Sequence, residues 1–267
     1  TRARASTTAI TVIDPLHYRS WLKGQSKRTR HWLKATGFGG GECQHTTLPS
    51  ADGKLAGVVF CQPADGEIWS WSGLAAELPH GSYRIDGMLD QSTANRAALG
   101  WAMASYAFTR YGKPKRRIGN LVWPAGADQA RITAAIEATF LVRDLINTPA
   151  ADMGPSQLAD EARTLAQTHG AKVNMIVGDD LLGANYPAIH AVGRAASDPP
   201  LLIDLIWGDE QAPKVTLVGK GVCFDSGGLD LKPASYMKLM KKDMGGGAHV
   251  LGLAHMIMKT RLNVRLR

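Results

Sequence analysis

The sequence predicts an α/β fold in two parts, an N-terminal α/β domain over residues 1–125 and a three-layer α/β/α domain over residues 126–267. Short apolar runs alternate with turn-forming residues in the first part, and helical segments alternate with apolar runs in the second. The later runs are continuously apolar, which is typical of strands covered on both faces of a sheet. A chain of 267 residues is long enough for two cores.

In the first domain, two apolar runs bounded by Gly and Pro predict strands at Leu55–Cys61 and at residues 118–123. Between them, residues 94–111 contain no proline and a single glycine, which favours a helix. Residues 36–41 are glycine-rich, but they lack the Lys-Ser/Thr ending of a phosphate-binding P-loop. We therefore predict a loop there.

The second domain is predicted to begin after residues 124–128 with a helix over 131–147, where apolar residues recur at helical spacing. It ends before Pro149, because the residue before a proline avoids the helical region. A second helix is predicted from Pro155, where proline suits the first turn, to Gly170. The apolar runs that predict central strands are Lys172–Val177, 201–207 and 215–218.

The last predicted elements are a helix over Gly245–Lys259 and a strand beginning at Leu262. Two histidines of this helix, His249 and His255, are six residues apart and so lie on opposite faces. We expect them to pack or to face solvent rather than to bind one ion together.

Composition favours a cytoplasmic protein. No run reaches about 18 consecutive apolar residues, the length that suggests a membrane span, and residues 1–20 lack the apolar core of a signal peptide. The three cysteines are too scattered for a disulfide framework or a Cys-based zinc site. We therefore expect Cys43, Cys61 and Cys223 to be buried as small apolar side chains in a reducing compartment.

The formal net charge of +8 is unevenly distributed. Residues 2–34 hold eight Lys or Arg against a single acid, Asp14, and a second basic cluster follows at 110–117. Such patches can contact nucleic acid, but these lack the interleaved aromatic residues of a recognised binding motif. Solvated faces are the favoured interpretation.

A cluster of charged residues follows the last apolar run. The run leads into Lys220, and Asp225, Lys232 and Asp243 follow in a glycine-rich stretch. Ligands bind beyond the carboxyl ends of strands in α/β sheets, and carboxylates suit divalent cations. A lysine is a rarer ligand because its amine must be neutral, a condition that a nearby metal ion supplies. The spacing alone leaves both a metal site and simple ion pairs open.

The sequence of this stretch, residues 218–246, closely resembles that of the leucyl aminopeptidase family of two-metal cytosolic exopeptidases. It has the spacing Lys-x4-Asp-x6-Lys-x10-Asp. Residues 147–155, Asn-Thr-Pro-Ala-Ala-Asp-Met-Gly-Pro, resemble a second family stretch, and residues 185–194 are a weaker third. The resemblance covers the second half of the chain. It implies a metallo-exopeptidase domain with a mixed sheet and, before it, a divergent N-terminal α/β domain.

By this resemblance, the chain is part of an aminopeptidase that removes leucine or other apolar N-terminal residues from peptides. Lys220, Asp225 and Asp243 would be ligands of two divalent ions, Zn²⁺ or Mn²⁺, with Asp225 bridging them. Lys232 would stay charged and donate to the scissile carbonyl, and Asp243 would also bind the α-amino group of the substrate. Met240 would line the pocket for the first side chain, although a plain packing role is equally open to it.

The family's second metal motif, Asn-Thr-Asp-Ala-Glu-Gly-Arg, is absent from these 267 residues. Its Asp and Glu would complete the metal site, and its Arg would hold a bicarbonate. We therefore expect the chain to be the N-terminal part of a longer enzyme and to be inactive alone. The resemblance also implies a homohexamer. No membrane association is expected, because no apolar run is long enough to span a membrane.

An alternative is a non-catalytic or moonlighting protein that binds nucleic acid through its basic N-terminal half. The residues expected to carry that binding are Lys23, Lys27, Arg28 and Arg30.

Overall fold

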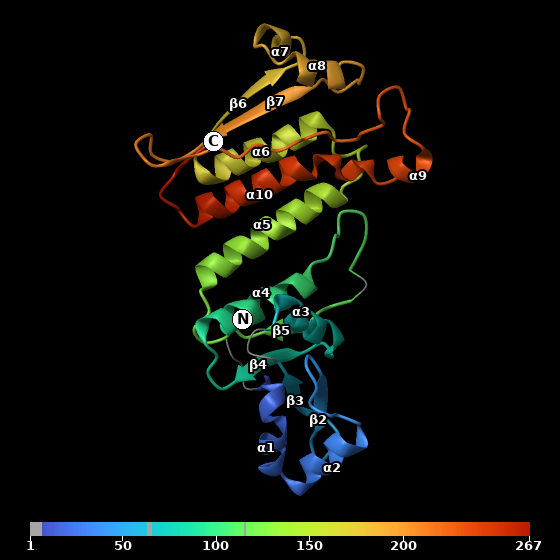
Figure 1. Cartoon of the computed structure of the whole chain (residues 1–267), viewed down its shortest axis with the longest axis vertical. Coiled ribbons are helices and arrows are strands. Elements are labelled where there is room, and N and C mark those ends of the chain that lie inside the picture. Colours follow the sequence, from blue (N-terminus) through green and yellow to red (C-terminus); the bar gives the residue numbers. More distant parts are fainter. Residues whose placement is uncertain (1–6, 63–65, 115) are drawn as a thin grey trace. The chain divides into compact units, whose positions relative to one another are not determined.

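The computed structural model describes residues 7–62, 66–114 and 116–267. The described residues form two compact units, one made of 7–109 and 113–132 and the other of 110–112 and 133–267 (Figure 1). Both units combine helices with β-sheet, which confirms the predicted α/β class. Among the described helices, none has the length and apolar character that crossing a membrane requires.

The first unit is built on a sheet whose described strands number five, in the order β2-β3-β1-β4-β5. The strands are β1 (Thr8–Ile13), β2 (His45–Pro49), β3 (Leu55–Cys61), β4 (Ser82–Asp86) and β5 (Asn120–Leu121). The neighbours β3, β1, β4 and β5 are parallel, and β2 runs antiparallel to β3 at one edge. The sheet is therefore mixed.

Helices cover both faces of this sheet. They are η1 (Pro15–His17), α1 (Tyr18–Lys23), α2 (Lys27–Ala35), α3 (Ile68–Glu77) and α4 (Gln91–Ser105). Alternate residues of β3 enter two cores, because side chains of a strand point to opposite faces. Phe60 packs with Trp71 and Trp101 of α3 and α4, whereas Val59 packs with Leu33 of α2.

Three predictions for the first unit need correction. The helix predicted over 94–111 is α4, which ends earlier because Tyr106 is extended (φ −61°, ψ 130°). The strand predicted over 118–123 is shorter than expected, because only its residues Asn120–Leu121, which form β5, pair with β4. Cys43, which we expected to be buried, is exposed, because its backbone pairs with Cys61 at a turn with φ 59° while its side chain faces solvent.

The second unit has three long helices: α5 (Gln129–Asn147, which begins in the first unit), α6 (Pro155–His169) and α10 (Gly245–Lys259). Gly170 ends α6 in the left-handed conformation (φ 67°). Helix α10 approaches α5 closely at Gly252, where a Cβ atom would lie 2.5 Å from Val142 Cγ2. It also contacts α6, so α10 lies between the two other helices (Figure 1).

The remaining elements of this unit are short. They are β6 (Lys172–Val177), α7 (Asp180–Gly183), α8 (Pro187–Gly193), β7 (Leu201–Ile206), β8 (Lys214–Val215), α9 (Ala234–Met237), η2 (Met240–Met244) and β9 (Arg265–Leu266). Strand β6 is antiparallel to β7, and β8 is parallel to β9. The predicted bounds of β6 and α10 are confirmed.

The strands of the second unit are less covered than their apolar runs predict. In β6, Lys172, Asn174 and Val177 are exposed, because α6 packs on one face of the β6–β7 pair through residues such as Val173. The run predicted at 215–218 pairs as a strand only at β8, and Val218 is 90% exposed. Within the described residues, α6 therefore covers one face of the β6–β7 pair, while Lys172 and Asn174 are exposed.

Candidate functional site

The predicted site residues lie together on the segment that joins β8 to α10. Lys220 follows β8, and Asp243 lies in η2, immediately before α10. The Nζ atom of Lys220 lies 2.6 Å from Oδ2 of Asp243. That oxygen is buried, and no described group donates a well-directed hydrogen bond to it, so the contact is an ion pair only.

A second Lys–Asp pair lies on the loop between them. Lys232 Nζ donates to Asp225 Oδ2 at 2.5 Å and lies 3.2 Å from Met240 Sδ. The other oxygen of Asp225 accepts from the backbone N–H of Gly227 at 2.8 Å. The hydrogen bond from Lys232, and then the one from Gly227, holds the pKa of Asp225 below its usual value. Asp225 is thus an anion at neutral pH.

Gly227 shapes this loop. Its φ of +81° is in the left-handed region, and a Cβ atom there would lie 2.8 Å from Lys232 Cγ. The chain can therefore fold back tightly enough for Lys232 to reach Asp225.

Glycines also bring Lys220 to Asp243. A Cβ atom on Gly219 would lie 2.5 Å from the carbonyl oxygen of Gly246, and one on Gly246 would lie 3.0 Å from the amide nitrogen of Lys220. The N–H of Gly247 donates to the carbonyl of Lys220 at 2.7 Å. The backbone after β8 is thus packed directly against the first turn of α10.

The two pairs interact electrostatically. The close contact with Asp243 is the largest cause of the raised pKa of Lys220, and the charge of Asp225 raises it further. Lys220 and Lys232 therefore face Asp243 and Asp225 within one charged cluster.

The donor set fits a divalent cation in part. Two carboxylates, one with an oxygen that no described hydrogen bond uses, suit a hard or borderline ion. Lys220 fits as a ligand only after it loses the proton that its present pKa favours, which a bound cation promotes. The described residues hold no cluster of three or more His, Cys, Asp or Glu suited to a metal. A metal here must therefore use the lysine or additional ligands.

Three other groups behave differently from the site. His249 contacts the carbonyl of Gly245, whereas His255 is hydrogen-bonded to His169 at 3.0 Å and to Glu137 at 3.1 Å. The two histidines are separated, as predicted, but His255 joins a network between helices that the sequence did not indicate. Burial raises the pKa of the Cys223 thiol to about 11, so this cysteine is not a reactive thiolate.

Lys241 is the residue of this region that sequence reasoning missed. Its ammonium group contacts backbone carbonyls at the end of α5. Its partners are 94 and 95 residues away, and a lysine next to another lysine carries no local signal of such a contact.

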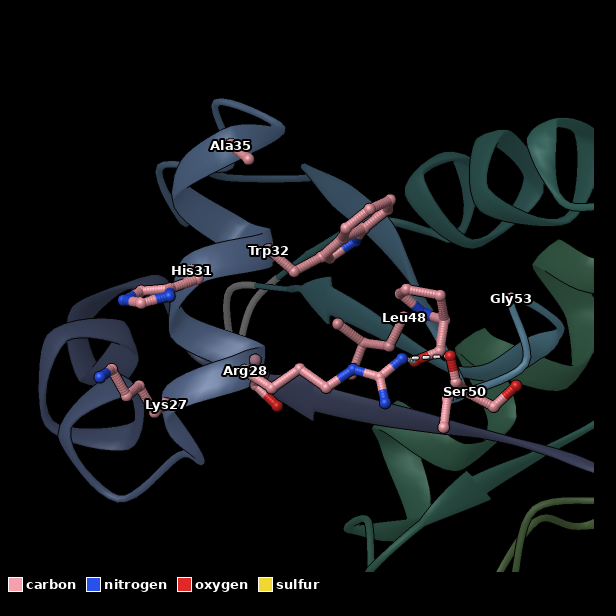
Figure 2. Close-up of a pocket in the computed structure, with 11 residues that line it drawn as sticks. Lys27, Arg28, His31, Trp32, Ala35, Leu48, Ser50 and Gly53 are labelled. Carbon is pink, nitrogen blue, oxygen red and sulfur yellow. Dashed lines mark hydrogen bonds between the residues drawn. The ribbon is translucent and has the colours of Figure 1, made fainter.

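The N-terminal unit contains a pocket of about 910 Å³ between α2 and the β2–β3 turn. Figure 2 shows Arg28 and Trp32 pointing toward the strand side, near Leu48, while Lys27 and His31 point away. Arg28 donates to the carbonyls of Pro49 and Ser50. Trp32 Nε1 donates to the carbonyl of Thr47 at 2.8 Å. The residues around the pocket include the basic Lys27, Arg28 and His31, but the charge of Arg28 is already used to hold α2 on β2.

Comparison with known proteins covers both units. Residues 140–267 match the family model described as "Cytosol aminopeptidase family, catalytic domain", and residues 9–124 match "M17 aminopeptidase, N-terminal domain". A probable cytosol aminopeptidase of Leifsonia xyli subsp. xyli is 34% identical over 251 residues, which are 88% of this chain and 51% of that protein. Peptidase B of Klebsiella pneumoniae is 36% identical over 234 residues, covering 77% of this chain and 54% of that protein.

Solved structures give the same result. The crystal structure of the cytosol aminopeptidase from Coxiella burnetii superposes with a TM-score of 0.92 at 45% identity and covers 99% of this chain and 58% of that one. The bottromycin maturation enzyme BotP, in complex with Mn, gives a TM-score of 0.77 at 29% identity over 98% of this chain and 58% of that one. The chain thus spans about half the length of the relatives it matches.

Proposed function

The chain belongs to the cytosol aminopeptidase family, and from this premise we propose that the whole protein is a metal-dependent aminopeptidase that releases N-terminal residues from peptides. The observation that carries the proposal is the pairing of Lys220 with Asp243 and of Lys232 with Asp225 on one segment. We also propose that residues 1–125 form the N-terminal domain and that 126–267 form the N-terminal part of the catalytic domain. The extent of the two family matches supports this division.

In this proposal, Lys220, Asp225 and Asp243 would hold the divalent ions. The ions, when bound, polarise the scissile carbonyl and activate a water molecule near neutral pH. We propose Zn²⁺ or Mn²⁺, and the Mn complex of the related BotP supports the second. A bicarbonate in the complete enzyme is part of the same proposal.

Lys232 acts on the substrate as a charged donor. Its ammonium group is held by Asp225, so it is available to donate to the carbonyl oxygen as negative charge develops there. One such donor contributes on the order of 3 kcal/mol of transition-state stabilisation.

The remaining site residues select the substrate. Asp243 offers a carboxylate to the α-ammonium group of the peptide, which would restrict cleavage to the first residue. Met240 lies beside Lys232 and offers an apolar surface to the first side chain, which supports a preference for leucine or similar residues. We propose in addition a cytoplasmic location and assembly as a homohexamer.

Hydrolysis of leucine p-nitroanilide by the full-length protein with Mn²⁺ tests the proposal. Lys232→Ala is expected to lower kcat about 100-fold to 1,000-fold, because a single oxyanion donor is lost. Asp243→Ala should abolish activity, whereas Lys238→Ala, at an exposed position after α9, should not change it. Wild-type rates in the first two variants would refute the assignment. That the 267 residues alone are inactive stays a prediction, checked by the same assay.

A second candidate function is nucleic-acid binding by the N-terminal unit. It is favoured by the basic lining of the α2 pocket. Lys23 and Lys27 give the cleaner test, because Arg28 and Arg30 also hold backbone carbonyls. Fluorescence anisotropy of a labelled duplex should show affinity falling steeply between about 50 mM and 200 mM salt, and less binding in the double alanine variant. No binding at low salt would exclude this function.

A further inference from the structure

We infer that Lys241 is a positioning residue for the proposed site: its ammonium group fastens η2 to the end of α5 and so fixes Met240 and Asp243. This inference rests on the proposed function for its consequence in catalysis. The contacts that carry it belong to the second unit alone and involve none of the charged pairs already described.

Lys241 binds the open end of a helix. Its Nζ atom donates to the carbonyl of Asn147 at 2.6 Å and to that of Ile146 at 3.2 Å. The last carbonyls of an α-helix have no partner within the helix and carry the negative end of its dipole. Pro149 follows soon after and has no N–H to offer them. A cation with several donors therefore suits this helix end, and Lys241 supplies one.

The segment fastened in this way has little other support at its start. η2 is a 3-10 helix of five residues, a conformation with weak internal hydrogen bonds. Leu239, which precedes it, is 60% exposed and has no side-chain acceptor to cap the helix. At the other end, Met244 is fully buried in the core. η2 is thus anchored by Met244 at its end and by Lys241 near its start.

The site residues of η2 lie on either side of these anchors. Met240 precedes Lys241 and contacts Lys232, while Asp243 lies between the anchors and faces Lys220. If the Lys241 contacts are lost, the start of η2 is released and both side chains change position. Site residues must be held within fractions of an ångström to function, so a small shift is sufficient to weaken cation binding.

Lys241→Met in the full-length protein tests this role, because methionine keeps the length of the side chain and removes the donors. Two measurements separate positioning from general stability: the Kd for Mn²⁺ by titration calorimetry, and hydrogen exchange of residues 239–245 in metal-free protein. We expect a Kd raised about tenfold or more, as for lost supports of metal ligands, together with faster exchange in that segment. Lys241→Arg, which keeps a charged side chain with several donors, should restore both.

Lys259→Met is the matched control. Lys259 is also a partly exposed lysine of this unit, but it pairs with the side chain of Glu137 and lies at the end of α10 far from η2. It should lower thermal stability while leaving the Kd for Mn²⁺ and the exchange of 239–245 at wild-type values. Equal effects of the two methionine variants, or wild-type values in Lys241→Met, would overturn the inference.

The test also separates this inference from the proposed function. A wild-type protein that binds Mn²⁺ but does not hydrolyse peptides would refute the function, and the Kd comparison would still decide on Lys241. If the wild-type protein binds no Mn²⁺, the link to a metal site is refuted. Exchange in residues 239–245 then decides whether Lys241 anchors η2.

Discussion

The core of the N-terminal unit and the candidate site of the second unit are each stabilised by a different kind of contact. In the N-terminal unit, large aromatic side chains fill the core, and Phe60 and Trp71 stack edge to face with ring centroids 5.0 Å apart. Around the candidate site, Gly219 and Gly246 instead allow backbone to approach backbone. The first arrangement depends on side-chain volume and the second on its absence. Truncation of a side chain should therefore destabilise the core, whereas enlargement of a glycine should disturb the site.

Trp71→Ala tests the first half of this comparison and should have the largest effect. Trp71 is fully buried, so its truncation is expected to lower the free energy of unfolding by about 3–5 kcal/mol. Trp71→Phe should cost less, because the ring contact with Phe60 remains and an indole N–H without a described acceptor is removed. Urea unfolding monitored by hydrogen exchange of β3 gives the measurement. A loss below about 1 kcal/mol in the alanine variant would contradict the prediction.

Gly219→Ala tests the second half. The added Cβ would lie 2.5 Å from the carbonyl of Gly246, so the backbone must move, at a cost of about 1–3 kcal/mol. Affinity for Mn²⁺ should fall with it, because Lys220 is displaced. Gly183→Ala is the control, since its Cβ would meet no described atom within 4 Å. Calorimetric titration of both variants is decisive, and equal affinities would show that the close approach does not matter.

Gly73→Ala should have the opposite sign. Gly73 is exposed within α3, and a Cβ there would meet no described atom within 4 Å. Alanine is expected to stabilise the N-terminal unit by about 0.5–1 kcal/mol through helix propensity alone. A lower thermal midpoint than wild type would refute the distinction between glycines that the fold needs and glycines that it tolerates.

The smallest effect should be a pH dependence of the second unit. Burial, and then the charge of His255, holds the pKa of His169 below its usual value. The stability linked to His169 is therefore fully present above about pH 6.5, the pKa of a histidine in the unfolded chain. It is lost as pH falls through the lower pKa that His169 has in the folded protein. Thermal midpoints measured at falling pH should decline less in His169→Gln. Identical slopes in the two proteins would exclude this histidine as the cause.

The sequence was most informative where the signal is local. The bounds of α10 and β6 follow from apolar patterning, and the bounds are confirmed. By contrast, β1, β2 and β4 were not predicted. β2 is half-buried throughout, and it acquires its partner only when β3 folds beside it. Such strands have no periodic pattern strong enough to be recognised before the sheet exists.

The same division holds for the candidate site. The spacing and the family resemblance identified Lys220, Asp225, Lys232 and Asp243. They did not show which lysine pairs with which carboxylate. That pairing depends on the fold of the loop around Gly227. The contacts of Lys241 and of His255 join residues about a hundred positions apart, so packing alone reveals them.

The hydrogen bonds from α2 to β2 have a consequence for the behaviour of the protein in a crowded solution. β2 is an outermost strand of the sheet, and Trp32 and Arg28 occupy the carbonyls of Thr47 and Pro49 along it. A strand from another molecule would have to displace both side chains before it could pair there, and covered edges of this kind resist intermolecular strand addition. Once α2 packs on β2, this edge of the sheet is therefore protected from intermolecular strand pairing.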